Sequence, residues 1–211
     1  MSQRLYGRDY RRDRRDDAYL IRRRKASQRK SWHWKLGPLT DQGSTPHCVG
    51  HAGYGWLSAT PVRQRPLPPH GLYALAQQFD EWEGTDYDGT SVRGLFKALH
   101  LAGLVIEYRW ARTLDAVLNH VLDCGPMVIG VNWYEGMADP DRHGMMRVDG
   151  EVLGGHAGLV YGADRNRQTL AFRNSWGPDW GKRGNARISF ADFERLLRED
   201  GEACTAIETR P

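Results

Sequence analysis

The stretch DQGSTPHCVGHAGYGWL, residues 41–57, places a lone cysteine, Cys48, where a helix is expected to begin. The helix would carry Gly50, Gly53 and Gly55, and each glycine costs about 1 kcal/mol of helix propensity relative to alanine. Small and apolar residues occupy most of its sides, so we expect a buried helix in close contact with its neighbours. Gln42 lies six residues before the cysteine. The arrangement therefore predicts a buried helix start with a thiol and an amide close together.

The bulk composition limits the class of protein. A chain of 211 residues forms one domain, or two small lobes that share a core. No run of about 18 apolar residues occurs, so a membrane span is not expected, and the charged N-terminus lacks the apolar stretch of a secretory signal. Cys48, Cys124 and Cys204 are too few and too widely spaced for a disulfide scaffold. We expect a reducing compartment, and therefore a cytoplasmic location.

Residues 1–30 form a basic arm. They hold 12 of the 30 lysines and arginines but 4 of the 26 acidic residues, so the arm carries a net +8 and the body a net −4. We expect a solvated or partner-docking extension, in which Tyr10, Tyr19, Leu20 and Ile21 could dock on the body. An arginine-rich arm can neutralise phosphates, but the interspersed aspartates dilute its field. We therefore expect a protein partner rather than nucleic acid, and no membrane partner.

The periodicity of the body changes near residue 125. Helical patterns dominate residues 31–125, and strand-like runs dominate residues 126–211. This order predicts an α+β fold with a helical N-terminal lobe and an antiparallel sheet or barrel in the C-terminal lobe. The expected helices cover residues 48–59, 72–82, 90–103, 114–125 and 191–200, and the expected strands cover residues 126–133, 156–166, 169–177, 185–190 and 203–209.

Three separated sites carry the residue types of thiol chemistry: Cys48 with Gln42, His156 at the head of a strand, and Asn174 at the end of the next. A nucleophilic thiol needs its pKa lowered from about 8.5, which a helix N-terminus and a nearby histidine can do. An asparagine carbonyl oxygen can orient the imidazole without adding charge. The Gln42 amide and backbone N–H groups could stabilise an oxyanion.

Simpler interpretations of the cysteine exist. A free cysteine is commonly a small buried hydrophobe. Cys48 and His51 could form half of a zinc site, but no second pair follows at ligand spacing. The chain also has no glycine-rich phosphate loop. We therefore expect neither a metal nor a cofactor.

The order Gln, Cys, His, Asn, in a helical half followed by a β half, resembles the papain-like cysteine peptidases. The segment RNSWGPDWGKRGNARI (residues 173–188) is the most specific match, and GGHAGLVYG (154–162) resembles the segment around the family's histidine. A weaker match is DYDGTSVRGLFKALHLAGLV (86–105). The resemblance covers roughly residues 34–209 and is to bacterial or phage-like forms of the C1 family type without the usual propeptide.

The resemblance implies a role for each matching residue. Cys48 would be the nucleophile, His156 the general base and acid, Asn174 the residue that orients the histidine, and Gln42 the oxyanion donor. Trp176 would cover the hydrogen bond between Asn174 and His156 and contact substrate.

The resemblance also implies a substrate groove between the two lobes. Gly89 would lie near the backbone that binds peptide, and Gly154 and Gly155 would line the pocket that usually dominates specificity. A peptide or protein is therefore the expected substrate.

Several positions depart from the family pattern. Thr45 replaces a cysteine, so the usual disulfide is absent, and Val49 replaces a tryptophan. Pro46 and His47 replace a Gly-Ser pair, which should change contacts near the scissile bond. The arm is shorter than the common inhibitory prodomain, although GRDYRRDRRDDAYL is faintly similar to a short D-x-R-D leader.

Three functions remain open at this stage. The first is a cysteine-type endopeptidase that acts through an acyl-enzyme. The second is a papain-like scaffold for binding or assembly, for example in a virion or another phage-type particle, in which Pro46 and His47 crowd the cleft. The third is an amidase or transpeptidase that uses the same triad.

Overall fold

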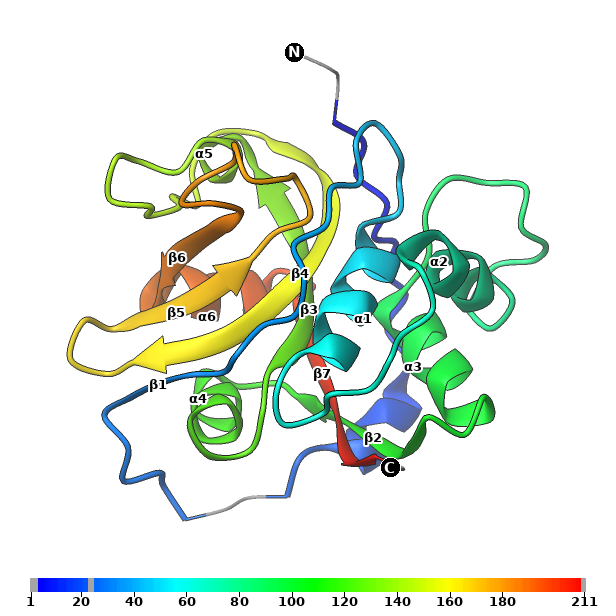
Figure 1. Cartoon of the computed structure of the whole chain (residues 1–211), viewed down its shortest axis with the longest axis horizontal. Coiled ribbons are helices and arrows are strands. Elements are labelled where there is room, and N and C mark those ends of the chain that lie inside the picture. Colours follow the sequence, from blue (N-terminus) through cyan, green and yellow to red (C-terminus); the bar gives the residue numbers. More distant parts are fainter. Residues whose placement is uncertain (1–3, 23–24, 210–211) are drawn as a thin grey trace.

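A computed structural model describes residues 4–22 and 25–209. Its centre is a seven-stranded antiparallel sheet in the order β2-β7-β3-β4-β5-β6, with β1 pairing on β4 (Figure 1). The strands are β1 (Ser31–His33), β2 (Val105–Ala111), β3 (Met127–Tyr134), β4 (Val152–Asp164), β5 (Thr169–Arg173), β6 (Asn185–Ser189) and β7 (Glu202–Thr209). The helices are the 3-10 helix η1 (Arg14–Tyr19), α1 (Cys48–Ser58), α2 (Pro69–Gln77), α3 (Val92–Leu101), α4 (Leu114–Asp123), α5 (Glu135–Ala138) and α6 (Phe190–Arg198).

Two hydrophobic cores lie on either side of the long strands. One contains α1, α2 and α3 with parts of β2, β4 and β7, and the other contains β3 to β6 with α4 and α6. Figure 1 shows α1, α2 and α3 gathered on one side of β3 and β4, and β5 and β6 on the other. The two cores meet where α1 lies against β4, and this line is where the predicted site residues come together.

Local sequence explains the helix boundaries. The Ser91 hydroxyl accepts a hydrogen bond from the Gly94 amide at the start of α3, which satisfies one of the amides that a helix start leaves unpaired. Gly103, with φ of 73°, follows the end of α3 in the left-handed conformation that glycine adopts readily. Leu95, Phe96 and Leu99 are fully buried, as the apolar periodicity of this helix predicts.

The α+β prediction is confirmed, but the predominantly helical range 31–125 also contains two strands, β1 and β2. Strand β2 lies within residues 31–125 and was not predicted, because its side chains do not alternate regularly between buried and exposed. Its pairing with β7 shifts register around Glu107, which removes the period-two signal. Helix α4, also in this range, packs on β4 and α6 rather than with α1 to α3.

Among the described residues, no helix combines the length and apolar character needed to cross a lipid bilayer.

The glycines of α1 offer a test of its packing. A β-carbon on Gly50 would overlap the Pro69 carbonyl oxygen and come within 2.8 Å of the Tyr73 nitrogen, whereas one on Gly55 would find its nearest atom, on Leu159, at 3.6 Å. Gly50→Ala should therefore destabilise the fold by about 1–3 kcal/mol through overpacking. Gly55→Ala should be neutral or stabilise it by up to about 1 kcal/mol through helix propensity. Urea unfolding of both variants measures the difference, and equal stabilities would contradict the close approach of α1 and α2.

Candidate active site

His156 and Asn174 are joined by a buried hydrogen bond. His156 lies in β4, Asn174 directly follows β5, and these two strands pair antiparallel. The distance from His156 Nε2 to Asn174 Oδ1 is 2.8 Å. Because Asn174 Oδ1 also accepts the Ser175 amide at 2.8 Å, the oxygen is the acceptor and Nε2 carries the hydrogen. His156 Nδ1 is then the basic nitrogen, and within the described part of the chain it has no hydrogen-bond partner.

Two tryptophans shield this hydrogen bond from water. The ring centroids of Trp133 and Trp176 lie 4.6 and 5.1 Å from that of His156. Trp176 is only 4% exposed and Trp133 is fully buried. The placement of Trp176 agrees with the cover that its motif implies. Burial lowers the pKa of His156 to about 4, although the bond to Asn174 opposes this shift, so the imidazole is neutral at pH 7.

Cys48 is the first residue of α1 and is completely buried. The backbone amides of Ala157, Gly7 and Val49 are polar groups that act on its thiol. Burial raises the pKa of the Cys48 thiol to about 11, and the three amides oppose that rise. With both pKa values shifted in these directions, the thiol and the imidazole are uncharged at neutral pH in this arrangement.

The Gln42 side chain is fixed by hydrogen bonds to three residues. Its Oε1 accepts the Ser175 hydroxyl at 2.7 Å, and its Nε2 donates to the carbonyl of Thr45 at 2.7 Å and to that of Leu5 at 3.1 Å. Ser175 was not predicted as a site residue, although its position directly after Asn174 in the Asn-Ser-Trp motif was a usable signal. The amide expected to serve an oxyanion is thus directed at a carbonyl of the chain's own arm.

The N-terminal arm runs through the site. The Tyr6 ring lies 6.1 Å from both His156 and Trp176, and the Arg8 amide donates to the Gly155 carbonyl at 2.9 Å. In Figure 1 the N-terminal segment, in dark blue, passes beside α1 before it reaches η1. The predicted catalytic groups are therefore covered by residues 5–9 of the same chain.

The three glycines assigned to peptide binding contact this arm. A β-carbon on Gly155 would overlap the Arg8 carbonyl oxygen, one on Gly154 would lie 2.7 Å from the Tyr6 β-carbon, and one on Gly89 would overlap the Asp9 carboxylate. Backbone hydrogen bonds continue this contact, because the Thr90 amide donates to the Gly7 carbonyl at 3.0 Å and the Asp9 amide to the Thr90 carbonyl at 2.9 Å. The arm lies where a peptide was expected.

The expected docking of the arm holds for Ile21, which packs against a hydrophobic core, whereas Tyr19 and Leu20 stay exposed. These side chains are 51% and 37% exposed. The arm instead buries Arg8 and Asp16, which are 4% and 6% exposed. Asp16 forms ion pairs with Arg93 and, at 3.4 Å, with Arg112. Aspartates that were expected to dilute a phosphate-binding field therefore bind body arginines.

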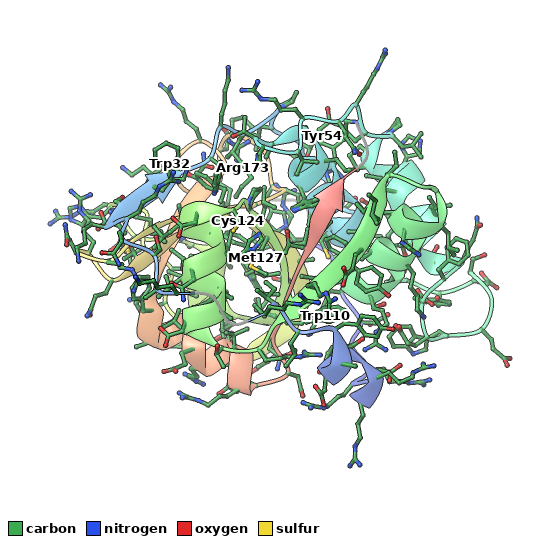
Figure 2. All side chains as sticks on the ribbon, turned by 90° about the horizontal axis from the view of Figure 1, so that it is seen from below. Trp32, Tyr54, Trp110, Cys124, Met127 and Arg173 are labelled. Atoms are coloured by element: carbon green, nitrogen blue, oxygen red, sulfur yellow. The ribbon has the colours of Figure 1, made fainter. Side chains whose placement is uncertain are left out.

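The end of the arm follows β2. The Ile21 amide donates to the Trp110 carbonyl at 2.8 Å, and Figure 2 shows Trp110 beside η1. Residues 4–21 therefore run along the body, although most side chains of residues 11–20 remain exposed, as composition suggested.

The departures Pro46 and His47 have different consequences. The His47 ring packs on Tyr73 with centroids 4.2 Å apart, so it lies against α2 rather than over the thiol. The Pro46 carbonyl lies so close to Gly7 that any β-carbon at Gly7 would overlap it. Pro46 therefore shapes the cleft at the point where the arm passes Cys48.

Cys48 and Cys204 are buried free thiols. In the ranges that the structure covers, no group of three histidine, cysteine or acidic side chains could hold a metal ion.

Comparison with solved structures shows which fold this is. Xylellain, a cysteine protease from Xylella fastidiosa, matches with a TM-score of 0.73 at 17% identity over 99% of this chain and 98% of its own. The Carica candamarcensis cysteine protease CMS1MS2, solved in complex with E-64, matches with a TM-score of 0.68 at 14% identity over 86% and 100% of the two chains. Procathepsin L 3 from the larval midgut of Tenebrio molitor matches with a TM-score of 0.65 at 16% identity over 89% and 72%. The chain therefore has the papain-like fold, as its motifs predicted.

The sequence comparisons are weaker. No family model matches the chain. Cathepsin B-like cysteine proteinase 3 of Ostertagia ostertagi is 30% identical over 83 residues, which is 38% of this chain. The match spans about half of that relative, 48% of its length.

Alkylation tests whether burial keeps the Cys48 thiol neutral. A thiol with a raised pKa stays protonated until the pH approaches that value, so iodoacetamide at pH 7 should modify Cys48 at least about 100-fold more slowly than an ordinary exposed cysteine. Gly7→Ala cannot keep the arm against Pro46 and should raise the rate about tenfold or more. Arg14→Ala, at an exposed arm position, is the control and should leave the rate unchanged. Fast alkylation of the unmodified chain, read at Cys48 by peptide mass spectrometry, would contradict the buried thiol.

Proposed function

We propose that this chain is a cysteine-type endopeptidase that hydrolyses peptide bonds through Cys48, His156 and Asn174, with Gln42 as the oxyanion donor. The observation that carries the proposal is the buried hydrogen bond between His156 and Asn174, 2.8 Å long, in a papain-like fold where the strand of His156 packs against α1, the helix that begins at Cys48. The curated relative and two of the solved structures are named cysteine proteases or proteinases, and the third is a procathepsin.

The groups support a two-stage reaction. His156 Nδ1 takes the thiol proton, and the Cys48 thiolate attacks the substrate carbonyl carbon. Gln42 Nε2 and the Cys48 amide stabilise the resulting oxyanion. The imidazolium donates its proton to the leaving amine as the C–N bond breaks, which leaves an acyl-enzyme. His156 then deprotonates a water molecule that attacks the thioester, and the acid product leaves as the thiol is restored.

The arm would restrain this activity. Gly7 and Tyr6 cover the reacting groups, and Gln42 already donates to the Leu5 carbonyl at 3.1 Å. A substrate cannot use the same amide and the same glycines while residues 5–9 occupy them. The proposed enzyme is therefore inactive until the arm is displaced or cleaved.

Covalent labelling tests the proposed nucleophile. A peptidyl epoxide with uncharged side chains should label the chain once, at Cys48, with slow kinetics because of the arm. Cys48→Ala should abolish labelling, and His156→Ala should slow it about 100-fold or more, because a positioned base contributes about that much. Intact mass measures the stoichiometry. Failure to label Cys48 in the folded chain, even after Gly7→Ala opens the cleft, would contradict the proposed role of Cys48 as nucleophile.

The oxyanion role of Gln42 has its own test. In the Gly7→Ala background, which opens the cleft, Gln42→Ala should lower kcat for peptide hydrolysis about 100- to 1000-fold, because one preorganised oxyanion donor is lost. Thr45→Ala, which keeps the backbone carbonyl that Gln42 contacts, serves as the neighbouring control. An unchanged kcat in Gln42→Ala would remove the residue from the mechanism.

The alternative of a binding scaffold has one observation in its favour. The arm is anchored by the buried ion pair of Arg8 and Glu202, whose side chains are 2% and 3% exposed, and such an anchor suits a permanently closed cleft. A chain that folds normally, never reacts at Cys48 and binds a partner through the arm would favour this role. No contact in the described residues favours the amidase or transpeptidase alternative over hydrolysis.

A further inference from the structure

The side chain of Arg8 fills a pocket beside the proposed reaction centre. The pocket is bounded by Val92 at the start of α3, Gly130 in β3, and Gly155 in β4, and it ends at Glu202 in β7. Both partners at its end are almost fully buried, with side-chain exposures of 2% for Arg8 and 3% for Glu202. The pocket therefore encloses a whole arginine side chain with its charge.

The polar groups of the pocket fit a guanidinium. Arg8 Nε donates to Glu202 Oε1 at 3.2 Å, and a terminal nitrogen donates to the Asp200 carbonyl at 2.5 Å. These two acceptors take hydrogen bonds from two different nitrogens of the planar guanidinium, whereas a lysine would present one compact ammonium. The arrangement favours arginine over lysine and excludes acidic side chains.

Gly130 leaves the space that the guanidinium needs. A β-carbon there would lie 2.7 Å from Arg8 Nε and 2.9 Å from Glu202 Oε1. Any larger residue in the middle of β3 would therefore force the ion pair apart. The shape of the pocket therefore depends both on the absence of a side chain at Gly130 and on the Glu202 carboxylate.

Glu202 needs a cation when the arm leaves. Burial raises the pKa of Glu202, and Arg8 is the largest of the influences that lower it, followed by the more distant Arg112 and Arg93. Those two arginines already pair with Asp16. Removing Arg8 would leave a buried carboxylate without its direct partner, which is costly.

The arm places the pocket close to the thiol, because Arg8 fills the pocket and the preceding residue, Gly7, supplies a backbone amide that acts on Cys48. The Arg8 amide donates to the carbonyl of Gly155, next to His156, and the Gly7 amide reaches the Cys48 thiol. A peptide that replaced the arm with its backbone against Gly155 would place one side chain at this pocket. A substrate side chain in this pocket would thus belong to a residue within one or two positions of the reacting carbonyl.

We propose that the Glu202 pocket selects peptide substrates with an arginine next to the scissile bond or one residue further, and that Arg8 holds the arm in the cleft by occupying this pocket. This inference rests on the proposed peptidase function. The arm and the substrate then compete for one carboxylate.

The test compares matched peptides on the full-length chain with Arg8→Ala, which frees the pocket. Internally quenched peptides differ at one position, which is arginine, lysine, citrulline or leucine, and mass spectrometry locates the cleaved bond. Citrulline keeps the shape of arginine but has no charge. We expect cleavage within two residues of arginine, and kcat/KM for arginine at least about tenfold above citrulline, because an uncharged isostere leaves the carboxylate unpaired. Lysine should fall between them.

Glu202→Gln in the same background assigns the preference to the carboxylate. It should reduce the arginine-to-citrulline ratio to near one, mainly through KM. Glu194→Gln, an exposed glutamate on α6, is the matched control and should retain the ratio. If Arg8→Ala does not fold by circular dichroism, Arg8→Thr, whose short side chain also leaves the pocket open, takes its place.

The outcomes separate this inference from the proposed function. Labelling of Cys48 by the uncharged epoxide, with peptide cleavage that shows no arginine preference, would overturn the pocket assignment and leave the peptidase standing. A preference that survives Glu202→Gln would also overturn it. Absence of both labelling and cleavage would overturn the peptidase and the pocket together.

Discussion

The contact between α1 and β4 is the constraint on which the site depends. It joins the two hydrophobic cores and brings the thiol at the start of α1 within hydrogen-bonding reach of the Ala157 amide, the residue after His156. The pairing of β4 with β5 then brings His156 to Asn174, with 2.8 Å between Nε2 and Oδ1. A shift of α1 along β4 would move Cys48 relative to the strand that carries His156, so the glycines that allow close helix packing are also requirements of the proposed chemistry.

The arm uses the same surface that a substrate would need. It provides a carbonyl to Gln42, backbone hydrogen bonds to Gly155 and Thr90, and a cation to Glu202. Its second anchor, the ion pair of Asp16 with Arg93, is buried and lies away from the thiol. Removing one partner of a buried ion pair strongly destabilises the folded protein, because the other charge is left buried and uncompensated. Restraint and recognition therefore depend on the same few charges, and weakening the Arg8 anchor should loosen the part of the arm that covers Cys48.

The sequence was sufficient for the fold class and for the residues that the structure brings together. A cysteine at a helix start, a histidine and an asparagine at strand ends, and the Asn-Ser-Trp motif each carry a local signal. Strand β2 was missed because its burial is irregular and its pairing depends on β7, nearly a hundred residues away. The path of the arm was missed for a similar reason. Charge patterning shows that the arm carries charged residues, but it does not show their partners. Arg8 pairs with Glu202 and Asp16 pairs with Arg93, both in distant elements.

The central claim is that the arm and a substrate occupy one cleft above Cys48. Hydrogen exchange of the full chain, with and without a peptidyl epoxide bound covalently at Cys48, tests it most directly. In the free chain the amides of Arg8 and Asp9 are bonded to Gly155 and Thr90 and should exchange slowly. Once the probe fills the cleft they should exchange at least about tenfold faster, since a lost hydrogen bond exposes an amide to solvent. Unchanged protection of residues 5–9 in the fully labelled chain would contradict the account.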